Sequence, residues 1–68
     1  MAIKDIISIY IQNNPRNIIR LVYRFGVSIQ IVENWASGIL IPPREKIGTI
    51  VDFITEELIN PQKNSNHF

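Results

Sequence analysis

Helix-breaking residues divide this 68-residue sequence into four helix-length segments, a three-residue link over residues 39–41 and a C-terminal tail. The breaks lie at Asn13-Asn14-Pro15, Gly26, Gly38, Pro42-Pro43 and Asn60-Pro61. Because glycine and proline interrupt regular structure, each segment between them can form only one short element. The length allows one domain and leaves no room for a second. We therefore expect a single domain over residues 1–60, followed by a mobile polar tail over residues 61–68.

The apolar residues of these segments recur at helical spacing. Between Arg16 and Phe25, four apolar side chains fall within one arc of about 100° on a helical projection. In the last segment the expected core stripe is Ile47, Ile50, Val51, Ile54 and Leu58. The first segment, Ile3–Asn13, fits a helix but also shows a strand-like alternation of isoleucines, and its length favours the helix. The sequence thus predicts an all-α fold, a compact four- to five-helix bundle.

Capping residues mark the ends of two of the predicted helices. Gly26 and Gly38 stand where a helix C-terminus favours the left-handed conformation, and Ser28 is a favourable N-cap. These signals predict one short helix between the two glycines, with Val32 and Trp35 on its apolar face. The opposite face carries Gln30, Glu33, Asn34 and Ser37.

Composition excludes several classes of catalytic and metal site. The sequence contains no cysteine and a single histidine, His67. A disulfide scaffold, a thiolate metal centre and a Cys nucleophile are excluded, and a His-dependent site is almost excluded as well. We therefore expect no enzymatic activity, no cofactor, no metal ion and no small-molecule substrate. The remaining function classes are mostly binding modules.

Neither a membrane span nor an export signal is visible in the sequence. The apolar stretch Ile6–Ile11 is far shorter than the roughly 20 residues that a transmembrane helix needs. The start of the chain lacks the cationic region and the cleavage site of a signal peptide. We expect a cytoplasmic protein with no membrane partner.

The basic side chains are unevenly distributed, although the net charge is only +1. Residues 1–50 contain six lysines and arginines against three acidic residues, whereas residues 51–68 contain one lysine against three acidic residues. Arg16, Arg20 and Arg24, spaced by four, form a stripe that faces away from the apolar arc of their helix. This distribution favours an anionic ligand on one side of the molecule.

Two predicted helices joined by Phe25-Gly26-Val27-Ser28 have the layout of a helix-turn-helix, whose second helix enters the DNA major groove. The pattern Val27-Ser28-x-x-x-Val32-x-x-Trp35-x-x-Gly38, followed by Ile41-Pro42-Pro43, Ile47 and Ile50, resembles the Cro/CI-type helix-turn-helix family. This family, also described as XRE-like or lambda-repressor-like, comprises phage repressors and related plasmid and bacterial regulators. The resemblance covers residues 3–58. It implies a homodimer that binds a pseudo-palindromic double-stranded DNA operator and represses transcription.

Candidate DNA contacts follow from this layout, with the helix over residues 28–37 as the reading helix. Glutamine and asparagine can bond adenine, a carboxylate can accept from cytosine N4, and an apolar side chain can touch a thymine methyl. The candidate base contacts are Ser28, Ile29, Gln30, Glu33, Asn34 and Ser37. The candidate phosphate contacts are Arg16, Asn17, Arg20, Arg44 and Lys46. Arg16 is the best placed of these, because the start of a helix also offers free backbone N–H groups.

Two other functions are compatible with the same sequence. One is a protein-interaction module, such as an antitoxin or assembly factor, that uses Phe53, Ile59 and the apolar N-terminal helix. The other is an excision or recombination accessory protein that bends DNA. In the dimeric regulator, Phe53 and Ile59 are the candidate dimer contacts.

Overall fold

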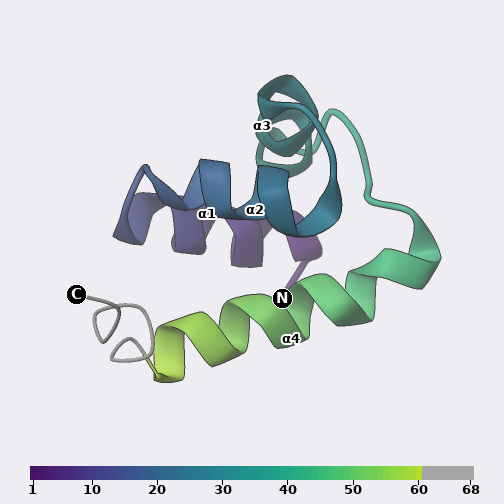
Figure 1. Cartoon of the computed structure of the whole chain (residues 1–68). Helices are drawn as coiled ribbons and strands as arrows, with labels where there is room; N and C mark the ends of the chain where they lie inside the picture. Colours follow the sequence, from purple (N-terminus) through teal and green to yellow (C-terminus); the bar gives the residue numbers. More distant parts are fainter. Residues whose placement is uncertain (61–68) are drawn as a thin grey trace.

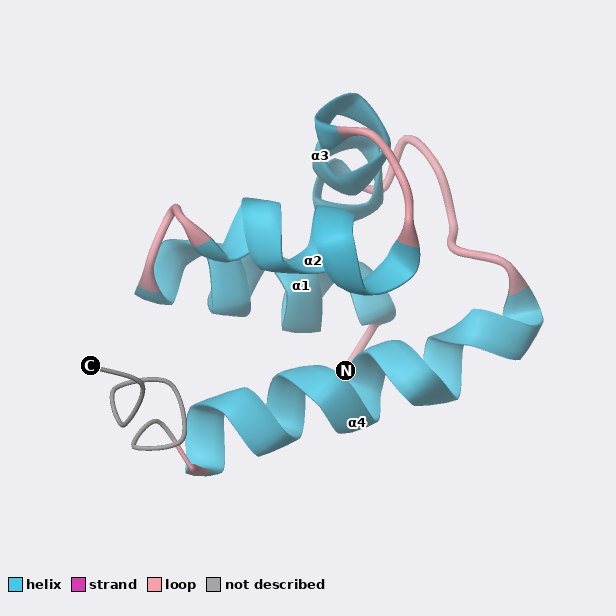
Figure 2. Cartoon of the chain, viewed as in Figure 1, coloured by secondary structure: helices cyan, strands magenta, loops and turns pink. Residues whose placement is uncertain are grey.

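The described part of the chain, residues 1–60, forms four α-helices and contains no strand (Figures 1 and 2). The structure is a computed structural model. Its helices are α1 (Ile3–Asn13), α2 (Asn17–Phe25), α3 (Ile29–Ser37) and α4 (Arg44–Ile59). The predicted all-α fold is confirmed, and the first segment is a helix rather than a strand. The expected tail over residues 61–68 lies outside the described residues.

The entry into α2 is a tight turn, so the helix begins one residue later than the spacing predicted. Oδ1 of Asn14 accepts a hydrogen bond from Arg16 N at 3.0 Å, and the carbonyl of Asn14 accepts from Asn17 N at 2.9 Å. The N–H groups of Ile18 and Ile19 donate to carbonyls three residues earlier, at 3.2 and 3.1 Å. This spacing is that of a 3₁₀ turn. The first N–H groups of α2 are therefore already bonded within the chain.

Two left-handed glycines end α2 and α3, as the capping pattern predicted. Gly26 has φ +65° and its N–H donates to the carbonyl of Val22 at 2.9 Å. Gly38 has φ +85°. Ser28 caps α3, because its Oγ accepts from Ile31 N at 3.2 Å. Glycine adopts the left-handed conformation without a steric cost, so the chain can turn sharply between the two helices.

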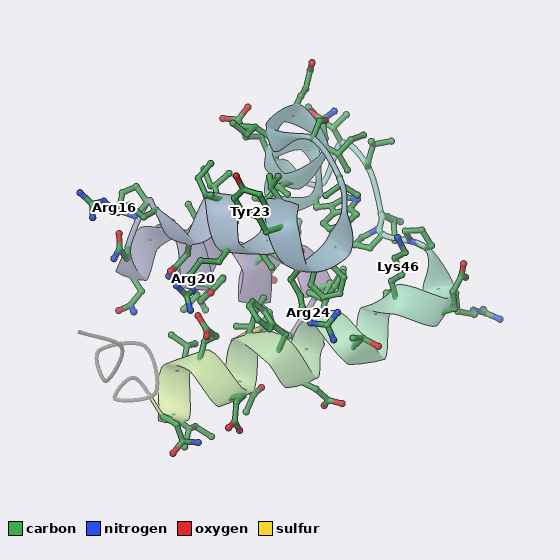
Figure 3. The ribbon with its side chains drawn as sticks, viewed as in Figure 1. Arg16, Arg20, Tyr23, Arg24 and Lys46 are labelled. Atoms are coloured by element: carbon green, nitrogen blue, oxygen red, sulfur yellow. The ribbon has the colours of Figure 1, made fainter. Side chains whose placement is uncertain are left out.

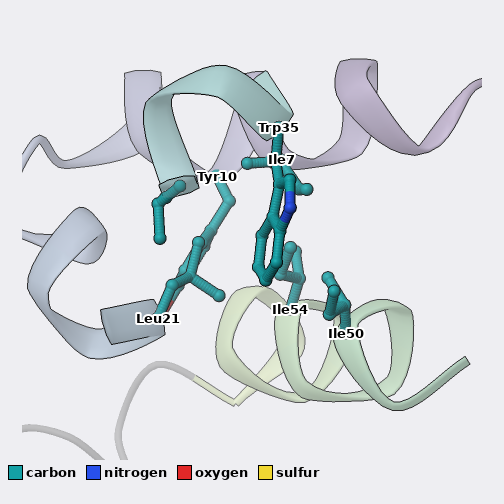
Figure 4. Packing of buried hydrophobic residues seen from close by; sticks show 7 residues of the cluster. Ile7, Tyr10, Leu21, Trp35, Ile50 and Ile54 are labelled. Atoms are coloured by element: carbon teal, nitrogen blue, oxygen red, sulfur yellow. The ribbon is translucent and has the colours of Figure 1, made fainter. Parts of the chain in front are cut away.

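The core gathers around α1, which packs against α2, α3 and α4. All four helices contribute buried hydrophobic side chains, most of which Figure 4 labels. The buried hydrophobic residues of this core are Ile7, Tyr10, Leu21, Val32, Trp35, Ile50 and Ile54. Phe25 meets Trp35 and Phe53 edge to face, with ring centroids 6.5 and 6.0 Å apart. Such ring pairs contribute about 0.5–1.5 kcal/mol each beyond their burial, so this aromatic cluster fixes α2, α3 and α4 relative to one another.

Leu58 does not belong to the core, and its placement in the core stripe of α4 was wrong. Its side chain is 38% exposed, whereas Ile50 and Ile54 of the same helix are buried. Leu58 lies in the last turn of α4, at the rim of a groove between α2 and α4, where the neighbouring helices cover it only in part. Phe53, on the same helix, is half-buried and packs against the core.

Candidate nucleic-acid interface

The two faces of α3 differ sharply in exposure. Val32 and Trp35 are buried and hold the helix against the core. On the other side Gln30, Glu33 and Ser37 are exposed and Asn34 is half-buried. Ile29, at the start of the helix, is exposed as well. The polar face that the sequence predicted is thus directed to solvent, where a ligand can reach it.

The two serines at the ends of α3 bond to the backbone. Ser28 Oγ accepts from Ile31 N, so this hydroxyl serves first as a helix cap. Ser37 Oγ donates to the carbonyl of Asn34 at 3.2 Å and accepts from Ile39 N at 3.5 Å. Gln30, Glu33 and Asn34 are therefore the side chains of this face best suited to reading base edges.

Asn17 is not available to phosphate, and its assignment as a phosphate contact was wrong. Its side chain is only 7% exposed, and its Nδ2 donates to the carbonyl of Tyr10 at 2.8 Å. A buried amide needs such a partner, because an unpaired polar group in the core costs about 1–3 kcal/mol. Asn17 thus joins the start of α2 to α1.

The sequence predicted that Arg20 faces away from the apolar side of its helix. In the structure its side chain reaches α4. Its Nε donates to Glu57 Oε1 at 2.6 Å and its Nη2 to Glu57 Oε2 at 3.2 Å. Oε1 of Glu57 also accepts from the hydroxyl of Tyr10 at 2.6 Å. The hydrogen bonds to Glu57 raise the pKa of Arg20, and burial together with the bond to Glu57 raises the pKa of Tyr10. Arg20 therefore forms an ion pair that joins α2 to α4, and because its side chain is still 42% exposed, its contact with phosphate stays a prediction.

The other predicted phosphate contacts lie at the starts of α2 and α4. Arg16 and Arg44 are exposed, and Lys46 is half-buried. Figure 3 shows Arg16 projecting from the start of α2 and Lys46 on the first turn of α4. The expectation that α2 offers free N–H groups beside Arg16 was wrong, because the Asn14 turn already bonds them. At this end, Arg16 offers its guanidinium to an anion but no free backbone N–H groups.

Lys4 is a cation near α3 that sequence reasoning missed. A Cβ added to Gly38 would lie 2.9 Å from Lys4 Cδ and 3.8 Å from its Nζ. The ammonium thus lies beside the C-terminal end of α3, where a cation also stabilises the helix dipole. Because Lys4 belongs to α1, no local spacing indicates this proximity. It adds a positive charge next to the polar face of α3.

A second candidate surface is a groove of about 1050 Å³ that residues of α1, α2 and α4 line. No residue of α3 lines this groove. Its rim carries Arg16, Arg24 and Tyr23, and Tyr23 is 83% exposed (Figure 3). Arg24 lies over the ring of Phe25, 5.1 Å from its centroid. This surface shares Arg16 with the candidate phosphate contacts.

The candidate dimer contacts occupy different environments. Phe53 packs on the core, where its ring meets Tyr10 and Phe25 edge to face, whereas Ile59 is 69% exposed at the end of α4. A more extended apolar surface lies between α3 and α4, where Ile39 and Ile41 are 73% and 76% exposed.

The described residues, 1–60, contain neither a cluster of three or more metal-ligating side chains nor a helix with the length and apolarity to cross a bilayer. Comparison of the chain with protein-family models, with curated proteins and with solved structures finds no match.

Proposed function

We propose that this chain is a sequence-specific double-stranded DNA-binding regulator that inserts α3 into the major groove. The observation that carries the proposal is the outward polar face of α3, held in place by Val32 and Trp35 behind it. The turn at Gly26 and the cap at Ser28 support a helix-turn-helix arrangement. A lambda-repressor-like fold of the Cro/CI type, acting as a repressor, is part of this proposal.

Each side chain on the α3 face has a base edge that it fits. Gln30 and Asn34 can each form two hydrogen bonds to adenine N6 and N7, and Glu33 can accept from cytosine N4. Ile29 can contact a thymine methyl at the start of the helix. One good bidentate pair contributes about 1–3 kcal/mol of discrimination against the wrong base.

Basic side chains of α1, α2 and α4 would supply the contacts that position α3 without reading sequence. Lys4 lies at its C-terminal end and Arg16 at the start of α2. Arg44 and Lys46, in the first turn of α4, are suited to the flanking strand. Phosphate contacts of this kind fix register and orientation, while base contacts carry specificity.

The direct test is selection from a random duplex library with the purified chain, followed by binding measurements on the enriched site. We expect Gln30→Ala and Asn34→Ala to weaken binding to the enriched site by about 5- to 150-fold each, in line with the loss of one bidentate pair. Binding to unrelated DNA should stay nearly constant. Gln12→Ala, which removes an exposed amide from α1, is the matched control and should change neither.

Two outcomes would overturn the proposal. One is that no sequence is enriched over the input library. The other is that Gln30→Ala, Asn34→Ala and Gln12→Ala weaken specific and non-specific binding alike, since side chains that read bases must affect the specific site more.

A protein-interaction module is the second candidate function, and the exposed apolar residues Ile39 and Ile41 favour it. Exposed apolar patches on small domains commonly mark protein interfaces. A salt titration separates the two functions, because counterion release makes DNA binding weaken steeply with salt. The affinity of a complex held by apolar contacts does not fall steeply with salt concentration.

A further inference from the structure

The groove between α2 and α4 exposes aliphatic and aromatic side chains beside an arginine. On α2, Ile19 and Tyr23 lie one turn apart and are 42% and 83% exposed. Leu58 of α4, 38% exposed, lines the same groove. The volume of about 1050 Å³ slightly exceeds the range of about 300–1,000 Å³ for small-molecule pockets, so the groove can take several side chains of a larger partner. We name Ile19, Tyr23, Arg24 and Leu58 the α2–α4 groove surface.

The residue types that line this groove are those that dominate the binding energy of protein interfaces. Three of the chain's four arginines and both of its tyrosines line the groove, whereas no lysine of residues 1–60 does. Arginine and tyrosine are enriched among the residues whose truncation weakens protein complexes most, and lysine is depleted at interfaces. The composition of the groove is therefore typical of a surface that binds another protein.

Arg24 is the cation of this surface that a partner can use. Arg20 already pairs with Glu57, with 2.6 Å between Nε and Oε1. Arg24 is exposed, lies over the ring of Phe25 and pairs with no carboxylate of residues 1–60. Figure 3 shows Arg20 and Arg24 directed from α2 toward α4. A carboxylate of a partner in the groove would thus meet a guanidinium that no intramolecular carboxylate holds.

One carboxylate on an otherwise apolar partner fits this surface better than a chain of phosphates. A nucleic acid strand carries a phosphate at every nucleotide, and the proteins that bind it provide a positively charged groove along its backbone. The α2–α4 groove surface instead combines one cation with two aliphatic side chains and one aromatic ring. Arg16, a candidate phosphate contact, precedes Arg24 by eight residues, about 12 Å along a helix, and the peptide does not need it.

We propose that the α2–α4 groove surface binds an amphipathic peptide segment of another protein, with aliphatic side chains and a carboxylate. The aliphatic side chains pack between Ile19 and Leu58 and on the ring of Tyr23, while the carboxylate pairs with Arg24. Segments with one apolar face commonly bind in grooves of this kind. No residue of α3 lines the groove, so the peptide leaves the polar face of α3 uncovered. The inference does not depend on the proposed DNA binding.

The first experiment is selection from a displayed random-peptide library on the purified full chain. We expect the enriched peptides to combine aliphatic residues with an aspartate or glutamate. In fluorescence anisotropy with a synthetic copy of an enriched peptide, Tyr23→Ala should weaken binding by about thirty-fold or more, as for a hot-spot residue. Arg24→Gln should weaken it by about five-fold, the upper end for an exposed ion pair. Arg44→Gln, an exposed arginine outside the groove, is the matched control and should leave peptide binding unchanged.

A charge exchange tests the pairing with Arg24 directly. The peptide in which lysine replaces the acidic residue should bind Arg24→Glu more tightly than it binds wild type, which reverses the preference of the selected peptide. Circular dichroism establishes that the variants remain folded. Changes in the amide chemical shifts of the wild-type chain on peptide addition should concentrate at the α2–α4 groove surface.

Several results would overturn the proposal. They are the enrichment of no peptide, an unchanged preference after the charge exchange, and an equal loss of affinity with Arg44→Gln and Arg24→Gln. An oligo-dT strand whose binding Tyr23→Ala abolishes would also overturn it, because the groove would then bind single-stranded nucleic acid. None of these measurements involves duplex DNA, so failure of the peptide site and failure of the proposed function are distinguishable.

Discussion

Arg20 on α2 and Glu57 on α4 form a two-point ion pair, with Nε 2.6 Å from Oε1 and Nη2 3.2 Å from Oε2. The hydroxyl of Tyr10 on α1 donates to the same Oε1. The Glu57 carboxylate therefore joins α1, α2 and α4 near the C-terminal end of α4. Because α2 packs mainly on α1 and α3, this pair is a direct polar link between α2 and α4.

The first prediction separates the structural role of Arg20 from DNA binding. Arg20→Gln should lower the free energy of unfolding by about 1–2 kcal/mol, because Glu57 is then left partly desolvated without its charged partner. Binding to DNA, measured well below the melting temperature, should stay within two-fold of wild type. Arg16→Gln, at the exposed N-cap of the same helix, should leave the free energy of unfolding in urea nearly unchanged and weaken DNA binding measured by fluorescence anisotropy. If Arg20→Gln and Arg16→Gln weaken DNA binding equally, Arg20 contacts phosphate as well as Glu57.

The second prediction concerns the alkaline stability of the fold. The pKa of Tyr10 is raised in the folded state by burial and by the bond to Glu57, whereas in the unfolded chain it is about 10. The folded state thus retains the proton at a pH at which the unfolded state has lost it. Stability that Tyr10 contributes is present below about pH 10 and is lost as the pH rises above that value. Urea midpoints at increasing pH should fall more steeply for wild type and for Tyr23→Phe than for Tyr10→Phe.

The third prediction compares two glycines with opposite requirements. Gly26 has a positive φ, and an alanine there must adopt the left-handed conformation. Gly26→Ala should therefore destabilise the fold by about 1–2 kcal/mol. Gly48 lies inside α4 with open space around its Cα, so Gly48→Ala should stabilise the fold by about 0.5–1 kcal/mol. Urea denaturation of the two variants should give changes of opposite sign, and a loss of stability in both would mean that α4 does not continue through Gly48.

The features that depend on neighbouring residues could be predicted from the sequence. The left-handed glycines Gly26 and Gly38 and the cap at Ser28 involve partners within four residues along the chain. The two faces of α3 follow in the same way, because helical spacing alone separates the side of Val32 and Trp35 from the polar side. These local rules account for the number, type and approximate bounds of the helices.

The features that the sequence could not indicate are contacts between distant segments. A helical projection shows which side chains share a face, but not which other helix covers that face. Asn17 was assigned to phosphate and bonds α1 instead, and Arg20 pairs with Glu57, 37 residues away. Lys4 was overlooked for the same reason, since its neighbour Gly38 lies at the far end of α3. The errors in the candidate site are thus mainly errors of tertiary placement.

The fourth prediction tests whether Lys4 belongs to the DNA interface. Each phosphate that a cation neutralises contributes about 0.9 to the slope of log K against log salt. Lys4→Ala should make this slope shallower by about that amount, on specific and unrelated DNA alike, because phosphate contacts do not read bases. Arg24→Gln removes an exposed cation from the groove side of α2 and is the matched control, with no expected change in slope. If Arg24→Gln changes the slope while Lys4→Ala does not, the anion-binding surface is the groove between α2 and α4 rather than the polar face of α3. Because the net charge is only +1, a surface that binds DNA must concentrate its few cations, and this comparison locates them.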